Sequence, residues 1–397
     1  MTKRSPSENP FRIGGVVAGP FFTDRDDERR RIRRALIEPQ SHLLIYGPRR
    51  MGKTSTLVVV REELTREGRH VMLADLSTAS TVADITTRLL QAASRELGRR
   101  WPDFLASLVQ RVGVRLGLEA DPGTGLILPS LDVSLRQAPL EEQRATLAGA
   151  LDAIEQVAAA KRAHVGVILD EFQEIHRFGG EAAEAHLRGV IQHHRRVSYV
   201  LAGSDERLIQ AMTGRGRPFY KLLEPLQFGA MAPAHLAGWI DLRLRGAGVR
   251  SNGVGEAVVA VAGPRTRDVV QLARAVFDAG RTGGMADGAT LEEAFRGVVV
   301  AEEAPLRALW EGLTPLQQNV LRALAVRAAG LTTAATRRGF SLGAQGAATK
   351  AAQTLVARDL LVKDDTGYRF DNPFMRGWVI LYALPDVGRT LPVMHLP

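Results

Sequence analysis

Short runs of consecutive apolar residues alternate with longer amphipathic segments over the first half of the chain. The apolar runs lie at residues 42–46, 69–76, 164–169 and 198–204, and segments of helical periodicity separate them. Continuous apolar runs of this length are typical of buried parallel strands, because helices cover both faces of such strands. The pattern therefore predicts an α/β fold built on a parallel sheet.

The second half of the chain has a different texture. After residue 225 the apolar positions fall on alanine-rich helical stretches without a strong strand, and from residue 314 three helices precede a hairpin signal at Asp364-Asp-Thr-Gly. Three helices followed by a hairpin predict a winged helix-turn-helix. The predicted segments are an α/β core at 1–225, a helical lid at 226–303, a winged helix-turn-helix at 304–385 and a tail at 386–397.

Two local features modify the α/β core. Residues 113–136 hold two short strand-like stretches on either side of Asp121-Pro-Gly, which predicts a hairpin inserted into the core. Near the N-terminus, Thr23 or Asp24 is expected to cap the helix that follows, because both side chains can accept a hydrogen bond from a free helix N–H group.

The clearest chemical signal follows the first apolar run. Gly-Pro-Arg-Arg-Met-Gly-Lys-Thr at 47–54 has the G-x-x-x-x-G-K-T spacing of a phosphate loop, between a predicted strand and a predicted helix. The glycines let the backbone wrap so that N–H groups point at phosphate oxygens, Lys53 reaches the outer phosphates and Thr54 ligates Mg²⁺. The residues expected to bind the nucleotide here are Gly47, Pro48, Arg49, Arg50, Met51, Gly52, Lys53, Thr54 and Ser55.

A phosphate loop needs a second strand that carries a carboxylate. The run Val165–Leu169 ends in Asp170 and Glu171, so Asp170 is expected to hold Mg²⁺ and Glu171 to orient or activate the attacking water. Ser204 ends the next run, where it could contact the γ-phosphate or the water. An ordinary strand end and a turn-forming serine are the alternatives, and the upstream phosphate loop favours catalysis with ATP and Mg²⁺ as cofactors.

Arginines supply further candidates. Arg215 or Arg217, in a loop after the last core strand, could serve as an arginine finger for a neighbouring subunit, although an idle surface role fits equally well. Arg267, at the start of a lid helix, could fold over the phosphates, with Arg265 as its competitor.

Composition narrows the class of protein. The 397 residues carry a formal charge of +9 with only six lysines, which fits either a nucleic-acid-binding surface or an arginine-rich solvated surface. The absence of cysteine excludes disulfides, thiolate metal sites and a thiol nucleophile. The first ten residues lack the apolar core of a signal peptide and no stretch holds eighteen apolar residues, so a cytoplasmic protein without membrane contact is expected.

Taken together, the motifs resemble the archaeal-type ATPase family, within the STAND and AAA+ division of P-loop NTPases and related to origin-recognition initiators. The resemblance rests on Asn9-Pro-Phe-Arg, Phe22-Thr-Asp-Arg-Asp-Asp-Glu28, the phosphate loop, Leu169-Asp-Glu-Phe-Gln-Glu-Ile, Leu201-Ala-Gly-Ser, Pro218-Phe-Tyr and Phe370-Asp-Asn-Pro-Phe. It implies an ATPase core, a lid and a winged helix in that order, with Phe22 and Arg25 near the adenine. Gly263-Pro-Arg-Thr-Arg departs from the usual lid motif, and a nuclease-like domain found in many relatives is not carried over.

Two functions remain open. The first is a nucleotide-driven switch associated with double-stranded DNA through the winged helix, supported by the basic balance and by Arg337, Arg338, Lys350, Gln353 and Arg358. Against it, Asp364 and Asp365 would repel phosphates. The second is a signalling or regulatory STAND ATPase whose winged helix is an internal clamp, and whose ATP binding drives homo-oligomerisation or recruits a partner protein. Either would hydrolyse ATP slowly or only when assembled; a protein-remodelling motor would need an aromatic pore loop that is not found.

Overall fold

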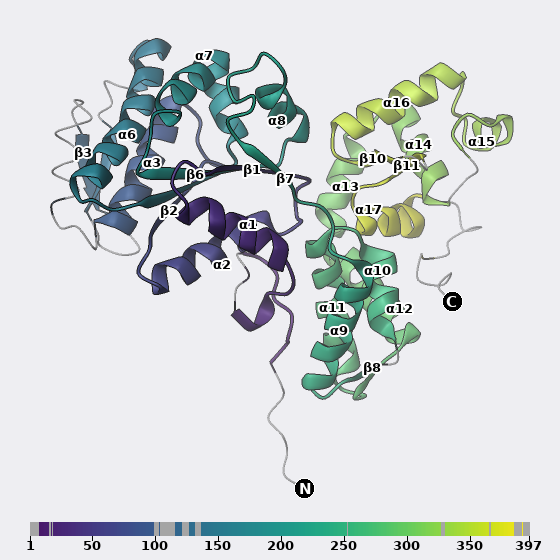
Figure 1. Ribbon diagram of the computed structural model, residues 1–397. Coiled ribbons are helices and arrows are strands. Elements are labelled where there is room, and N and C mark those ends of the chain that lie inside the picture. The colour runs from purple at the N-terminus through teal and green to yellow at the C-terminus, as the bar shows by residue number, and fades with distance from the viewer. Residues whose placement is uncertain are drawn as a thin grey trace, which may run out of the picture. The chain divides into compact units, whose positions relative to one another are not determined.

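The structure is a computed structural model that describes residues 8–15, 17, 19–98, 103, 116–120, 127–131, 136–251, 253–326, 330–364, 367–384 and 391 (Figure 1). The chain divides into two compact units. The sheet unit is Ala18–Gly229, and the helical unit combines Met1–Val17 with Ala230–Pro397. The backbone therefore passes between the units twice, once after residue 17 and once after residue 229.

A five-stranded parallel sheet forms the centre of the sheet unit. Its strands lie in the order β2-β5-β6-β1-β7, and every neighbouring pair is parallel, which confirms the predicted α/β class. The strands are β1 (His42–Tyr46), β2 (His70–Asp75), β5 (Val165–Asp170), β6 (Val197–Gly203) and β7 (Glu224–Gln227). β7 is absent from the sequence prediction, because it is short, largely exposed and contains Pro225. An edge strand tolerates proline, since one of its sides has no hydrogen-bonding neighbour.

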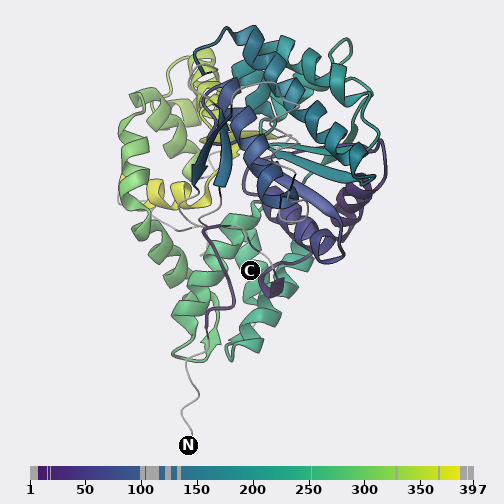
Figure 2. The same ribbon diagram turned by 90° about the vertical axis from the view of Figure 1, so that its left-hand side faces the viewer.

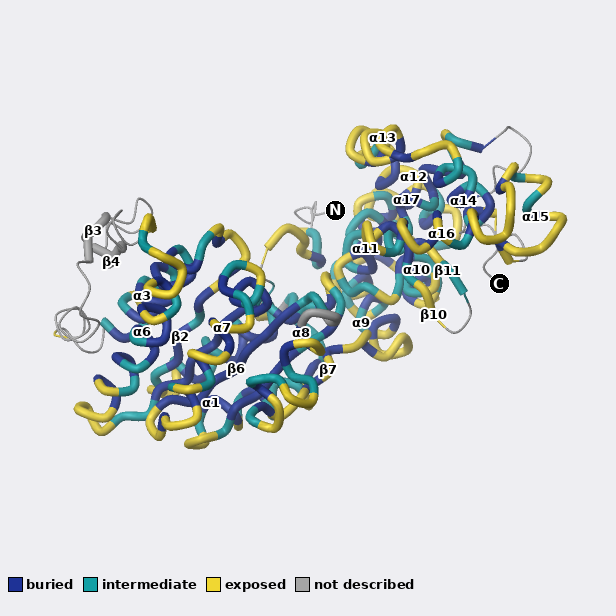
Figure 3. Tube along the Cα trace, turned by 90° about the horizontal axis from the view of Figure 1, so that it is seen from above, coloured by how far each residue is buried: buried dark blue, intermediate teal, exposed yellow. Residues whose placement is uncertain are grey.

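Helices cover both faces of this sheet (Figure 1). Leu43 and Ile45 of β1 belong to the core cluster of one face, while Leu44 belongs to the cluster of the other, as the two-residue strand period requires. The first face is covered by α1 (Asp26–Ile37) and α2 (Lys53–Arg66), and the second by α3 (Val82–Leu97), α6 (Leu140–Ala160), α7 (Gln173–Ile191) and α8 (Glu206–Thr213). Figure 3 shows the strands buried between helices whose outer sides are exposed.

Two predicted local features have different outcomes. The inserted hairpin is confirmed, since β3 (Leu116–Ala120) pairs antiparallel with β4 (Ile127–Leu131); its Asp-Pro-Gly turn lies outside the described residues. The predicted cap of α1 is wrong. After the short 3₁₀ turn Gly19–Phe21, Arg25 occupies the N-cap position at φ 73° and no side chain caps the helix. Three acidic residues in the first turn complement the positive helix end instead.

The helical unit follows the predicted order of helices and hairpin, and its assignment as a lid and a winged helix-turn-helix stays a prediction. Its elements are α9 (Pro233–Gly246), β8 (Arg250–Ser251), α10 (Val254–Ala262), α11 (Thr266–Gly280), β9 (Met285–Ala286), α12 (Gly288–Ala301), α13 (Glu303–Glu311), α14 (Pro315–Ala325), α15 (Ala334–Gly339), α16 (Gln345–Ala357), β10 (Leu361–Asp364), β11 (Gly367–Phe370), α17 (Pro373–Trp378) and the π-helical turn Val379–Ala383. Within the described ranges, none of the helices of either unit combines the length and the apolarity needed to cross a bilayer.

One hydrophobic core runs through all of the helical unit. Phe295 of α12 lies 5.7 Å from Phe374 of α17 between ring centroids, and Trp310 lies 5.6 Å from Trp378. A Cβ on Gly377 would come within 2.5 Å of the Phe295 ring, so only glycine permits this close approach of α17 to α12. The helices expected to form a lid therefore share their core with the elements expected to form a winged helix.

The N-terminal segment also belongs to this core, although it lies within residues 1–225, which are predicted to form the α/β core. Phe11 is fully buried and its ring meets Trp239 edge-on at 5.4 Å. The Asn9 side-chain amide donates to the carbonyl of Arg274 (3.1 Å), and the Arg274 guanidinium donates to the carbonyl of Phe11 (3.3 Å). Figure 2 shows this purple segment running beside the green helices of the helical unit.

A buried histidine cluster at the amino ends of β1 and β6 makes folding pH-dependent. His42 Nδ1 accepts a hydrogen bond from the Tyr199 backbone N–H (3.3 Å), and the Tyr199 hydroxyl lies 2.7 Å from His194 Nδ1. Burial, reinforced by the charge of His194, lowers the pKa of His42 from 6.5 to about 4, and burial likewise lowers the pKa of His194. Asp152 lies 3.6 Å from His194 Nε2 and opposes part of this effect.

We expect stability to fall as the pH drops from 6.5 towards 4. The unfolded chain binds a proton at His42 over this range and the folded chain does not, so the free energy of unfolding decreases by roughly 3 kcal/mol. Chemical denaturation of wild type and His42→Gln at several pH values measures the difference. The stability gap between the two proteins must change across this window and stay constant above pH 7. A constant gap throughout would mean that His42 is not the responsible group.

Candidate nucleotide-binding site

The phosphate loop connects the last residue of β1 to the first residue of α2. Arg50 (φ 67°) and Gly52 (φ 94°) have left-handed backbone conformations, so the chain turns sharply before the helix starts at Lys53. No side chain caps the N-terminus of α2. An uncapped helix start presents N–H groups and a partial positive charge, which attract an anion such as a phosphate.

Gly47 brings the loop into contact with the end of β7. A Cβ at this position would lie 2.3 Å from the carbonyl oxygen of Phe228, so a side chain is excluded. The Phe228 N–H in turn donates to the carbonyl of Tyr46 (2.7 Å). The first residue of the phosphate loop is therefore packed directly on the backbone that leads out of the sheet unit.

Lys53 is folded back over the loop. Its Nζ donates to the carbonyls of Gly47 (2.6 Å) and Pro48 (2.7 Å), and only 6% of the residue is exposed. These bonds close the loop into a ring around the ammonium group. The charge of Lys53 is thereby held at the centre of the loop, close to the uncapped helix start.

Thr54 and Asp170 bring two oxygen ligands together. The Thr54 hydroxyl donates to Asp170 Oδ2 (2.6 Å), and Asp170 Oδ1 accepts from the Glu171 backbone N–H (3.0 Å). Burial raises the pKa of Asp170 to about 6, although the Thr54 hydrogen bond opposes the shift. A buried carboxylate beside a hydroxyl suits a hard divalent cation, whose charge would stabilise the ionised carboxylate. In the described part of the chain, no cluster of three or more His, Asp or Glu offers an alternative metal site.

Glu171 is held at the carboxyl edge of the sheet by two donors on one oxygen. Its backbone is left-handed (φ 54°), the Ser204 hydroxyl donates to its Oε2 (2.7 Å), and the Gln173 side-chain amide donates to the same oxygen. The structure therefore brings Glu171 and Ser204 together, from the ends of two neighbouring strands. Arg49 of the phosphate loop reaches the same Ser204 hydroxyl (3.4 Å).

Gln173 belongs to the candidate site, although no role for it is predicted from the sequence. It is fully buried, and its Oε1 accepts from the Ser204 backbone N–H (3.3 Å) while its amide nitrogen donates to Glu171. The side chain thus spans β5 and β6 at the point where both end. A glutamine two residues after Asp-Glu carries no spacing signal of its own, because its role depends on the neighbouring strand.

Arg25 lies beneath the phosphate loop. Its guanidinium donates to the carbonyls of Met51 (3.0 Å) and Gly229 (2.8 Å), pairs with Glu28 (2.7 Å) and stacks 4.1 Å from the centre of the Phe228 ring. Only 3% of Arg25 is exposed. These contacts tie the loop to the last residue of the sheet unit, and a role beside the adenine stays a prediction.

Phe22, Met51 and Ser55 are further predicted nucleotide ligands. Phe22 is partly buried, with the guanidinium of Arg29 5.9 Å from its ring centre. The Met51 side chain belongs to the core beneath α1 and α2, which leaves its backbone to the loop, and Ser55 lies in the first turn of α2.

Arg215 and Arg217 have different surroundings in the loop after α8. The Arg217 guanidinium pairs with Glu181 (2.7 Å) and reaches the fully buried Glu184 (3.5 Å), which also contacts His176. Burial raises the pKa of Glu184, and the two basic neighbours oppose that shift. Arg217 therefore fastens its loop to α7, whereas Arg215 is exposed.

Arg265 and Arg267 also differ, and both lie in the helical unit. Arg265 forms an ion pair with Asp371, and both side chains are largely buried. Arg267, in the first turn of α11, is exposed. A role for Arg267 over the phosphates stays a prediction.

Comparisons with known proteins agree with this architecture. The AAA domain family matches residues 34–211. The chain is similar in structure to the Walker-type ATPase of Pyrococcus abyssi, with a TM-score of 0.59 and 15% identity over 90% of this chain and 96% of that chain. It is also similar to the ORC2 protein of Aeropyrum pernix, solved as ADPNP-ADP complexes, with a TM-score of 0.51 and 17% identity over 88% of this chain and 90% of that chain. The search among curated proteins found no match. The expected P-loop NTPase fold is confirmed.

Proposed function

We propose that the protein binds ATP with Mg²⁺ and hydrolyses ATP as a nucleotide-driven switch, because residues 34–211 match the AAA domain family and the fold is similar to that of a Walker-type ATPase. The observation that carries the proposal is the meeting of Thr54, Asp170, Glu171 and Ser204 beside an uncapped helix start. This combination offers phosphate binding, metal ligands and a base at a single edge of the sheet.

Each residue has a distinct task in this proposal. Lys53 would exchange the carbonyls of Gly47 and Pro48 for the outer phosphates of ATP. Thr54 and Asp170 would hold Mg²⁺, which when bound supplies charge neutralisation on the phosphates. Glu171 would orient the attacking water and accept its proton, while Ser204 and Gln173 fix the direction of the carboxylate.

The switch role is supported by the contacts of Arg25. Its guanidinium bonds Met51 in the phosphate loop and Gly229 at the end of the sheet unit. If the phosphate loop moves when nucleotide binds, Arg25 would transmit the movement to Gly229, where the chain leaves the sheet unit for the helical unit. Arg215 is the better candidate for an arginine finger, since Arg217 is held by two glutamates, and such a finger requires a homo-oligomer.

Association with double-stranded DNA is our preferred form of this function. Among the described residues around α15 and α16, the exposed cationic residues are Arg338, Lys350 and Arg358; Gln353 is exposed as well, and so is the acidic Asp359. Asp364 would repel a phosphate backbone, but it is paired with Arg369 (2.8 Å). The ion pair offsets the negative charge of Asp364 and so weakens this repulsion. Exposed positive side chains on these two helices suit a phosphate backbone.

A regulatory switch without DNA is the alternative, and a specific observation favours it. The helices expected to form the lid share one continuous core with α14–α17. The ion pair between Arg265 and Asp371 also joins the start of α11 to the residue after β11. Such packing suits an internal clamp that changes its state with the nucleotide, and oligomerisation or a partner protein would then be the output.

The test measures ATP hydrolysis, duplex DNA binding at several salt concentrations and particle mass by light scattering. The variant removes two exposed cations, Arg338→Ala with Lys350→Ala. Its matched control, Arg296→Ala with Arg307→Ala, removes two arginines of the helical unit that are each paired with a glutamate one helical turn away. If DNA is the partner, DNA stimulates hydrolysis, and only the first variant lowers the slope of affinity against salt, by about one for each phosphate that the protein no longer binds.

Two other outcomes separate the alternatives. ATP-driven growth in particle mass that is indifferent to DNA supports the regulatory switch. Absence of nucleotide binding by the wild-type protein contradicts both forms of the proposal.

A further inference from the structure

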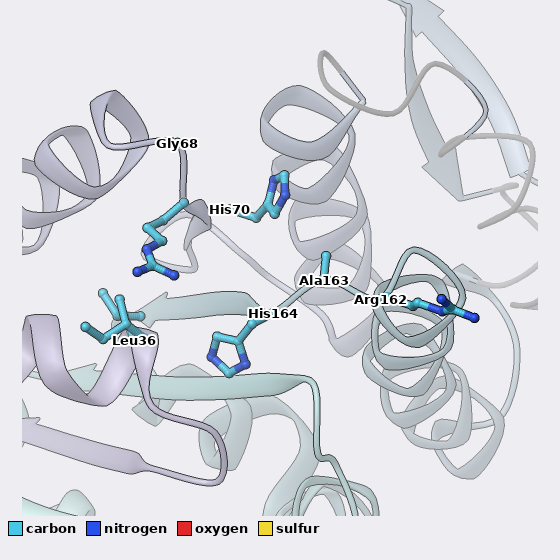
Figure 4. A pocket seen from close by; sticks show the side chains of 8 residues that line it. Leu36, Gly68, His70, Arg162, Ala163 and His164 are labelled. Carbon is cyan, nitrogen blue, oxygen red and sulfur yellow. The ribbon is translucent and has the colours of Figure 1, made fainter.

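A cavity of about 320 Å³ lies at the amino ends of β2 and β5, on the edge of the sheet opposite the phosphate loop. It is lined by Leu36, Ile37, Gly68, Arg69, His70, Arg162, Ala163 and His164 (Figure 4). Asp170 is the sixth residue after His164, at the far end of β5, which is roughly 20 Å along an extended strand. The cavity is therefore separate from the candidate nucleotide-binding site.

The ionisable residues that line this cavity are all basic. Arg69 and Arg162 contribute two guanidinium groups, His70 and His164 contribute two imidazoles, and no lining residue is acidic. Neither guanidinium makes a hydrogen bond or an ion pair within the described part of the chain. The arginines of the neighbouring α1 differ, because Arg29, Arg31, Arg33 and Arg34 are each paired with a glutamate.

His164 adds an unsatisfied polar group. Both of its ring nitrogens are buried and neither makes a hydrogen bond of ordinary geometry, although the Leu36 backbone lies close enough to favour the protonated ring. A buried polar atom without a partner costs free energy, so native proteins usually supply a partner or a ligand. Rotation of the ring about its terminal torsion would turn one nitrogen into the cavity, where Figure 4 shows His70 and His164 on either side of the space.

The two arginines could have a purely structural role, in which their guanidinium groups bind the carbonyl ends of neighbouring helices. The helices α1, α2 and α6 end beside the cavity, and each carbonyl end carries about half a negative charge. Arginines that serve such ends usually donate to the last carbonyls. The backbone N–H groups of Arg69 and Arg162 donate to the carbonyls of Leu64 (2.9 Å) and Ala159 (3.0 Å) at the ends of α2 and α6. Neither guanidinium group does so among the described residues, and Arg162 extends outwards in Figure 4. Because the helix-end carbonyls do not bind the two guanidinium groups, both groups are available to bind an anion.

We propose that this cavity binds a small oxyanion, a phosphate ester or a carboxylate that carries a short apolar group. The guanidinium of Arg69 would pair with two oxygens of the anion, and a neutral His164 would add one N–H donor. Burial lowers the pKa of His164, and the Leu36 backbone opposes only part of this shift, so the imidazole is neutral near pH 7. Leu36 and Ile37 would contact the apolar group, and the volume lies at the lower end of ligand pockets.

The test follows the imidazole NMR signals of the full chain at constant pH and ionic strength. Inorganic phosphate is the probe in one arm and butyrate in the other, which distinguishes a phosphate from a carboxylate ligand. The nine histidines of the chain are assigned with single variants, among them His70→Gln and His164→Gln. We expect the signals of His70 and His164 to shift in a saturable manner with at least one probe, independently of phosphate bound at the phosphate loop.

Two charge variants decide the outcome. Arg69→Ala should weaken binding at least tenfold, whereas Arg66→Ala, which removes a nearby arginine paired with Glu62 outside the cavity, should leave it within about twofold. Thermal melting verifies that both variants are folded. Shifts that never saturate, that exclude both histidines, or that weaken equally in the two variants would overturn the proposal.

Discussion

Glu171→Gln is expected to lower the rate of ATP hydrolysis by about 10²- to 10⁴-fold, the usual contribution of a general base. The amide keeps the size of the side chain but cannot accept a proton from water. ATP affinity should change little, because Lys53, Thr54 and the start of α2 are untouched. Single-turnover hydrolysis, together with equilibrium binding of a fluorescent ATP analogue, separates the two quantities.

Gln173→Leu is the informative companion of this variant. Leucine has a similar volume, yet it removes the donor to Glu171 Oε2 and the acceptor for the Ser204 N–H. The carboxylate itself remains, so hydrolysis should fall less than in Glu171→Gln, and its pH profile should move. Full activity in Glu171→Gln would assign the water to another group, and an unchanged pH profile in Gln173→Leu would remove Gln173 from the site.

Gly47→Ala is expected to weaken ATP binding by roughly ten- to a hundredfold. The new Cβ would lie 2.3 Å from the carbonyl oxygen of Phe228, so either the loop or the end of β7 must move. Such strain costs about 1–3 kcal/mol, and each 1.4 kcal/mol is a tenfold change in affinity. Isothermal titration with ATP and Mg²⁺ measures the effect, and a thermal melt reports the accompanying loss of stability.

The matched control is Gly229→Ala. Gly229 follows Phe228 directly, but a Cβ at this position meets no atom within 4 Å and its backbone φ is not positive. This variant should therefore bind ATP like the wild type. If both alanine variants bind equally well, the contact between Gly47 and Phe228 does not shape the phosphate loop.

The fold can be predicted from the sequence wherever several consecutive residues of a strand are buried, because such a strand is a continuous apolar run. β1, β2, β5 and β6 are apolar on both faces, so their runs are visible without knowledge of their neighbours. β7 has one buried residue and a proline, and only its pairing with β1 makes it a strand. The cap of α1 was mispredicted because the left-handed turn at Arg25 is accompanied by tertiary bonds to Met51 and Gly229.

The residues of the candidate site also fall into two groups: some can be predicted from the local sequence, and others depend on residues far away in the chain. The spacing of Gly47, Gly52, Lys53 and Thr54 is local, so the loop could be located from the sequence, and an apolar run ending in Asp170 and Glu171 marked the second strand. Gln173 acts across two strands, and the buried position of Arg25 depends on the end of β7. Whether Arg215 or Arg217 is free depends on Glu181 and Glu184, which are some thirty residues away in sequence.

The helical unit is discontinuous, and this affects how the chain folds during synthesis. Phe11 leaves the ribosome early, but Trp239 and the rest of its core follow only after the sheet unit has been made. At typical translation rates roughly 210 intervening residues take about 10–40 s. During this time Phe11 has no core to pack into, so the N-terminal segment can reach its final place only after the sheet unit has been synthesised.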